Sequence, residues 1–106
     1  MVNRVLKLPE LGLLIFLLRD KPNKDYLLAK LYAIEVTELD AEISGSLRFS
    51  NSRTDRRLGE KIAATRFLDE DGVPVFVSLY LDQQGELYEL DCWKVDDTPL
   101  RRIPAF

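Results

Sequence analysis

The sequence predicts an α+β fold, in which N-terminal helices pack on a four- to five-stranded, mainly antiparallel meander sheet. Two observations carry this prediction. A nearly continuous apolar run at residues 11–18 indicates a buried helix, and alternating apolar and polar residues from position 43 onward indicate half-buried strands. With 106 residues the chain is long enough for one core, so we expect a single α+β domain over residues 1–106.

Two helices are expected in the first third of the chain. Pro9 suits the first position of a helix and Pro22 cannot continue one, so the first helix is predicted over residues 10–20. Asn23 is the expected N-cap of a second helix at residues 24–32. The apolar run has 8 residues, far fewer than the roughly 20 that span a bilayer, so we expect no membrane association.

The remaining chain has the pattern of strands separated by polar turns. The strands are expected near residues 34–39, 43–49, 61–69, 73–82 and 86–95. Asp71-Gly72 and Gln84-Gly85 are typical of tight turns, so the last three strands are expected to form a meander. We expect the last two strands, which include the only tryptophan and the only cysteine, to be the centre of the sheet.

The register of the last hairpin follows from its side-chain pattern. Each strand of the hairpin has one apolar row. The row of the first strand is Val75, Val77, Leu79 and Leu81, and the row of the second is Tyr88, Leu90 and Cys92. An even number of loop residues pairs the two rows, whereas an odd number would bury Glu89 and Asp91 beside the valines. Because a one-residue slip turns a whole strand over, we predict the even loop.

The opposite side of this hairpin is the predicted protein contact face. It interleaves rings and carboxylates, namely Phe76, Tyr80, Glu89, Asp91 and Trp93. A three-residue turn at 70–72 would add Arg66 to this face, whereas a two-residue turn would add Phe67. Aromatic residues are enriched at binding hot spots, and carboxylates steer basic partners. Helices packed on this face would instead make Trp93 part of the core.

The composition excludes several chemistries. The chain has no histidine, which removes the Ser-His and Cys-His nucleophile pairs and most zinc sites. Cys92 is the only cysteine, so no intramolecular disulfide forms and the cytoplasm is the expected location. The acid pairs Glu89/Asp91 and Asp96/Asp97 are a weak signal for magnesium. We therefore expect no catalytic residue, no metal and no cofactor.

A basic segment at residues 48–66 precedes an acidic one at 69–97. The basic segment lacks interleaved aromatic residues, which proteins normally use to bind single-stranded nucleic acid. The formal net charge of −3 also argues against nucleic acid as a partner. We expect the basic side chains to pair with their own acidic neighbours.

Three motifs resemble a family of small uncharacterised bacterial proteins, a domain of unknown function. They are GSLRF at 45–49, DEDGVPV at 69–75 and GELYELDCWKVD at 85–96. The resemblance implies a bacterial cytosolic source. It implies no catalytic residue, because no activity is assigned to that family.

The expected function is a non-enzymatic protein-binding module, such as an immunity-type protein that masks a basic toxin or another protein partner. The alternative is a small-molecule-binding or enzymatic domain, with a carboxylate and tyrosine pocket between helix and sheet. That pocket would use Tyr80, Arg66, Glu89 and Asp91. A homodimer through residues 10–19 or through a sheet edge is compatible with both functions.

Overall fold

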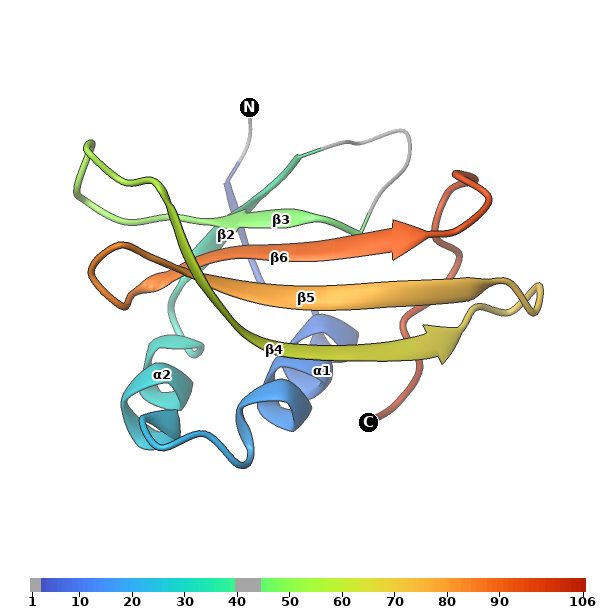
Figure 1. The fold of residues 1–106 in the computed structure, drawn as a ribbon, viewed down its shortest axis with the longest axis horizontal. Helices are drawn as coiled ribbons and strands as arrows, with labels where there is room; N and C mark the ends of the chain where they lie inside the picture. Colours follow the sequence, from blue (N-terminus) through green and yellow to red (C-terminus); the bar gives the residue numbers. More distant parts are fainter. Residues whose placement is uncertain (1–2, 40–44) are drawn as a thin grey trace.

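The structure is a computed structural model that describes residues 3–39 and 45–106. Within these residues the chain forms six strands and two helices (Figure 1). In chain order they are β1 (Arg4–Val5), α1 (Leu8–Leu18), α2 (Lys24–Lys30), β2 (Glu35–Glu38), β3 (Leu47–Phe49), β4 (Leu58–Leu68), β5 (Pro74–Asp82) and β6 (Leu87–Lys94). The α+β class is confirmed. The sheet has six strands instead of four or five, and β1 precedes the helices.

The strands form one antiparallel sheet in the order β1-β2-β3-β6-β5-β4. The last three strands form the predicted meander, but β3 pairs with β6 instead of β4, so a single continuous meander was a wrong expectation. The start of the predicted 43–49 strand, at positions 43 and 44, lies outside the described residues. Figure 1 shows the chain after β3 passing over the ends of β6 and β5 to reach the far edge as β4.

Two features hold this crossing in place. Arg56 donates hydrogen bonds to the backbone oxygens of Phe49 and Leu87 and to the Asp82 carboxylate, which ties the β3–β4 connection across the sheet end. Gly59 then passes directly over β5: a Cβ on this residue would lie 2.5 Å from the Asp82 backbone oxygen. Only glycine fits such a close backbone approach.

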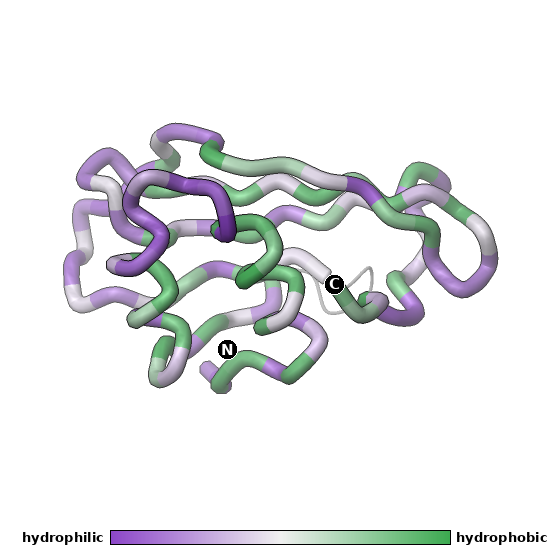
Figure 2. Tube along the Cα trace, turned by 90° about the horizontal axis from the view of Figure 1, so that it is seen from below, coloured by the Kyte–Doolittle hydropathy of each residue, from purple (hydrophilic) through white to green (hydrophobic). Residues whose placement is uncertain are grey.

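Both helices lie against one face of the sheet, here called the covered face (Figure 1). Its core is aliphatic and consists chiefly of Leu13, Leu14, Leu17, Leu18 and Leu27 from the helices and Val36, Val75, Val77, Leu79 and Leu90 from the strands. Figure 2 shows the molecule from below, with hydrophilic residues (purple) concentrated in the connections between elements. No helix in the described part of the chain is long and apolar enough to cross a membrane.

The register of the β5–β6 hairpin agrees with the prediction along most of its length. Val77 pairs with Cys92 and Leu79 pairs with Leu90. The loop, however, has an odd length: the Asp82 N–H bonds to the Glu86 oxygen around residues 83–85, with Gly85 at φ 84°. A left-handed glycine at the end of a three-residue loop is a common hairpin solution.

An irregularity after Tyr80 restores the apolar rows despite the odd loop. Leu81 faces Leu87, which is 3% exposed, instead of the predicted Tyr88. Tyr88 packs beneath the guanidinium groups of Arg48 and Arg56, 4.3 and 5.2 Å from its ring centre. A buried tyrosine needs a partner for its hydroxyl, whereas leucine fills the covered face without a polar group.

The turn between β4 and β5 settles the alternative that the sequence left open. The Asp69 N–H bonds to the Val73 oxygen around residues 70–72, and Gly72 has a φ of 79°. This three-residue loop places Arg66 opposite Phe76. Phe67 therefore lies on the covered face, where the centre of its ring is 6.0 Å from the ring centre of Phe106.

Candidate functional site

The predicted contact face is the sheet face turned away from the helices, here called the outer face. Arg66, Phe76 and Trp93 are direct neighbours across β4, β5 and β6. The Phe76 and Trp93 rings are stacked, with centres 6.0 Å apart and an interplanar angle of 29°. They are 42% and 51% exposed. The helices therefore do not cover Trp93, and this aromatic pair is open to solvent.

The turn after β6 places the carboxylate of Asp97 beside the indole ring of Trp93. The indole N–H donates to Asp97 Oδ1 at 3.1 Å. Asp97 has a φ of 59°, a left-handed conformation that aspartate tolerates better than most residues. Next to it, hydrogen bonds from the hydroxyl and N–H of Thr98 lower the pKa of Asp96. Of these two acids, Asp97 is the one that lies at the rim of the aromatic pair.

The remaining predicted residues lie further along the same face. Glu89 sits between Tyr80 and Arg48 in the sheet and accepts a hydrogen bond from Arg48 at 2.7 Å, so its charge is already paired. Asp91 accepts a hydrogen bond from the Ser46 hydroxyl at 3.0 Å. Within the described residues Asp91 has no cationic partner. Asp91 therefore adds to the acidic rim, whereas Glu89 does not.

An apolar extension of this face was missed by the sequence reasoning. Leu68, Pro74 and Val95 occupy the next row of the sheet beyond the row of Arg66, Phe76 and Trp93. Leu68 is 65% exposed and Val95 is 38% exposed. The sequence contained the signal for this extension, because each of these residues is two positions away from a residue of the predicted contact face. Side chains two positions apart on a strand lie on the same face of the sheet. The aromatic pair is therefore part of a larger exposed apolar patch.

The alternative pocket does not form from the predicted residues. Tyr80, Arg66, Glu89 and Asp91 all belong to the outer face, whereas the helices lie on the covered face. The hollows found among the described residues, including one of about 370 Å³ beside α2, are lined by other side chains. A pocket between helix and sheet would need a different set of residues.

The acid pairs do not gather into a metal site. Residues 3–39 and 45–106 contain no cluster of three histidine, cysteine, aspartate or glutamate side chains that could hold a metal ion. Cys92 lies on the covered face, where burial raises the pKa of its thiol to about 12. A thiol with such a pKa is protonated near neutral pH and is a poor nucleophile.

Part of the basic segment pairs with acidic residues, as expected; no ion pair of Arg57, Lys61 or Arg66 is found among the described residues. Arg53 and Arg56 both contact the carboxylate of Asp82, which has no exposed side-chain surface. Burial alone would raise the pKa of Asp82. Hydrogen bonds from Arg56 and from the N–H groups of Gln84 and Glu86 outweigh it and lower the pKa to about 2. This arginine cluster anchors the crossing connection.

A second charged anchor, centred on Lys94, was not predicted. Lys94 follows the apolar row of β6 onto the covered face, where 2% of its side chain is exposed. Its ammonium group contacts Asp69 at 2.9 Å, Asp71 at 2.7 Å and the Pro99 oxygen. Asp69 also accepts the N–H groups of Arg101 and Arg102, so the anchor fixes the C-terminal segment to the β4–β5 turn.

Comparison with known proteins gives a family and no activity. No curated protein and no solved structure matches the chain. The family model described as "Domain of unknown function (DUF6984)" matches residues 3–104, nearly the whole chain. The chain therefore belongs to this family of uncharacterised domains.

Proposed function

We propose that the protein is a non-enzymatic binding module whose outer face docks on a basic protein partner. The observation that carries the proposal is the exposed stack of Phe76 on Trp93. Tryptophan is the residue most enriched at binding hot spots, and large apolar side chains grouped on a surface mark interaction sites. Leu68 and Val95 extend this apolar centre.

The charges around the aromatic pair favour a basic partner. Asp91 and Asp97 lie on the Trp93 side of the pair, and Arg66 is the one cation next to Phe76 in the described sheet. An arginine or lysine of the partner would lie on an aromatic ring and pair with a carboxylate. The acidic rim would also speed the encounter at low salt.

In biological terms, we propose that the protein has an immunity-type role in a bacterial cytoplasm. Such a protein masks the basic surface of a toxin and needs a rigid contact face but no catalytic group. A small acidic domain with an exposed aromatic centre and an acidic rim suits that task. The role is a class-level analogy that rests on the contact face and on the net charge of −3.

Affinity capture from the native host tests the proposal. The immobilised wild-type protein is compared with a Phe76→Ala/Trp93→Ala double variant and with Tyr32→Ala. Tyr32 is 87% exposed and lies in the connection between α2 and β2, not on the outer face, so its substitution is a matched loss of an exposed ring. We expect wild type and Tyr32→Ala to retain the same basic protein at physiological salt, and the double variant to lose it.

Two further readouts make the experiment decisive. Thermal unfolding of the double variant checks that it is folded. Because both rings are about half exposed, we expect the variant to remain folded. Raising the salt concentration should weaken the retained complex, since exposed charges are screened. Capture of the same proteins by all three baits would contradict the proposal.

A further inference from the structure

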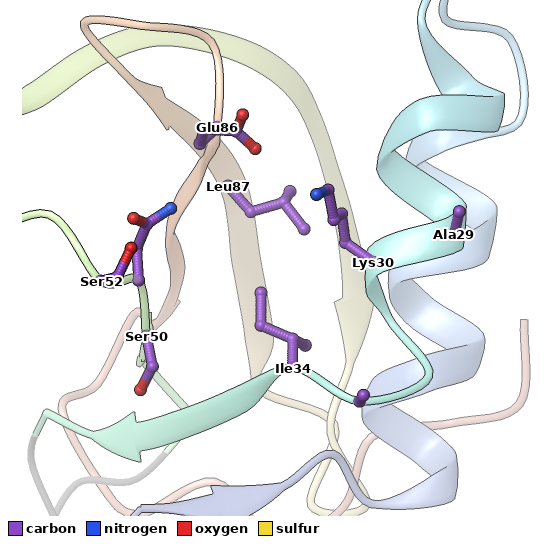
Figure 3. Close-up of a pocket in the computed structure, with 9 residues that line it drawn as sticks. Ala29, Lys30, Ile34, Ser50, Ser52, Glu86 and Leu87 are labelled. Carbon is purple, nitrogen blue, oxygen red and sulfur yellow. The ribbon is translucent and has the colours of Figure 1, made fainter.

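A hollow of about 370 Å³ lies beside α2, away from the outer face (Figure 3). Its walls come from the end of α2, the segment before β2, the segment after β3 and the start of β6. Ile34 and Leu87 form its apolar base; Leu87 is 3% exposed and Ile34 packs against the core. The volume is near the lower end of the roughly 300–1,000 Å³ that small-ligand pockets span.

Two opposite charges stand at the rim of this hollow. Figure 3 shows Lys30 reaching over it from α2 and Glu86 from the β5–β6 turn. Within the described residues neither side chain forms an ion pair, with the other or with a third group. Tyr26 orients both: its hydroxyl donates to Glu86 Oε2, and the Lys30 ammonium lies 4.9 Å from its ring centre.

The wall opposite α2 is polar and held by its backbone. The Ser50 N–H donates to the Glu35 oxygen at 2.8 Å, and the Asn51 side chain accepts the Arg53 N–H at 3.0 Å. No hydrogen bond of the Ser50 or Ser52 hydroxyl is found in the described part of the chain. Ser52 lines the hollow with an unused hydroxyl group, whereas the hydroxyl of Ser50 is turned away from its middle (Figure 3).

We propose that this hollow binds a small zwitterion, an apolar α-amino acid. Its carboxylate would pair with Lys30 and the hydroxyl of Ser52, and its ammonium group with Glu86. Its side chain would lie on Ile34 and Leu87. A ligand with one charge would desolvate the other rim charge without compensation, which disfavours it. This site goes beyond the proposed function, because it shares no residue with the outer face.

Backbone amide NMR with ¹⁵N-labelled protein tests the site, with L-leucine as the probe. We expect saturable shifts at residues 29–34, 50–52 and 86–87, with a Kd on the order of 1 mM for so small a ligand in an open site. N-acetyl-leucine lacks the cation and leucinamide lacks the carboxylate. Each should bind about tenfold more weakly, because each loses one charge-assisted contact.

Matched variants assign the charges. Lys30→Gln and Glu86→Gln should each weaken leucine binding about tenfold. Lys24→Gln, at another exposed lysine of α2, should leave it unchanged. The Phe76→Ala/Trp93→Ala variant should also bind leucine normally, so failure of the proposed function and failure of this site are told apart. Absence of saturation up to about 20 mM, shifts outside the hollow, or leucine binding by both charge variants as tight as that of wild type would overturn the inference.

Discussion

The two faces of the sheet use the same strands for opposite purposes. On β5, Val77 and Leu79 are at most 1% exposed, whereas Phe76 between Val75 and Val77 is 42% exposed. In the described residues Phe49 is the one aromatic side chain of the buried core, and Trp93 is outside it. A tryptophan buries more apolar surface than any other residue, so a fold built for stability alone would cover it. The difference separates residues that hold the fold from residues available for recognition.

The largest expected effect comes from the covered face. Leu79→Ala should lower the free energy of unfolding by about 3 kcal/mol, because it leaves a cavity in a fully buried aliphatic row. Ser78→Ala, at the neighbouring position on the outer face, should change it by less than about 0.5 kcal/mol. Urea unfolding of the two variants at neutral pH measures both values.

Equal losses of unfolding free energy in the two variants would contradict this difference between the faces. They would mean that the outer face is also covered in solution. In that case light scattering on wild type should reveal a second copy covering the sheet.

The charged anchor at Asp82 should give an effect of about the same size. Asp82→Asn leaves Arg56, with 9% of its side chain exposed, without its counter-charge. Losing one partner of such a buried pair costs about 3 kcal/mol. Asp55→Asn is the control: this carboxylate is 70% exposed, 3.9 Å from Arg53, and its loss should cost less than about 0.5 kcal/mol.

The same anchor predicts the direction of acid unfolding. The pKa of Asp82, about 2 in the folded protein, lies below its ordinary value of 3.8. The stability it contributes is therefore complete above about pH 4 and is lost as the pH falls through 2. Asp69 adds to this loss: burial would raise its pKa, but hydrogen bonds from the Arg101 N–H and Lys94 lower it to about 2. Asp82→Asn should reduce the slope of stability between pH 4 and pH 2, and an unchanged slope would contradict the assignment.

Alternation was sufficient to assign the two faces of β5 and the buried positions Leu90 and Cys92 of β6, but it placed Tyr88 wrongly. Period two separated Val77 and Leu79 from Phe76, and that separation defines both faces of the structure. The polar turns ending in Gly72 and Gly85 were also readable, because each needs a positive φ. The length of each loop was harder to read, since an irregularity after Tyr80 compensates for an odd loop.

Non-local contacts account for the features that were missed. The pairing of β3 with β6 depends on Arg56 and Gly59 meeting a strand more than 20 residues away, which no local pattern encodes. Lys94 is a cation at the end of the apolar row of β6. Its buried charge is compensated by the carboxylates of Asp69 and Asp71, which are distant in sequence. The hollow beside α2 likewise joins four separate segments of chain.

The smallest expected effect concerns the field around Trp93. This is the only tryptophan, so fluorescence quenching reports on the outer face alone. Asp97 and Asp91 should concentrate cations near the exposed ring, so at low salt caesium should quench more efficiently than iodide. Asp97→Asn should reduce the difference, whereas Asp20→Asn, an exposed acid after α1, should not. More efficient quenching by iodide would mean that Arg66 dominates the field, and the outer face would then favour an acidic partner over a basic one.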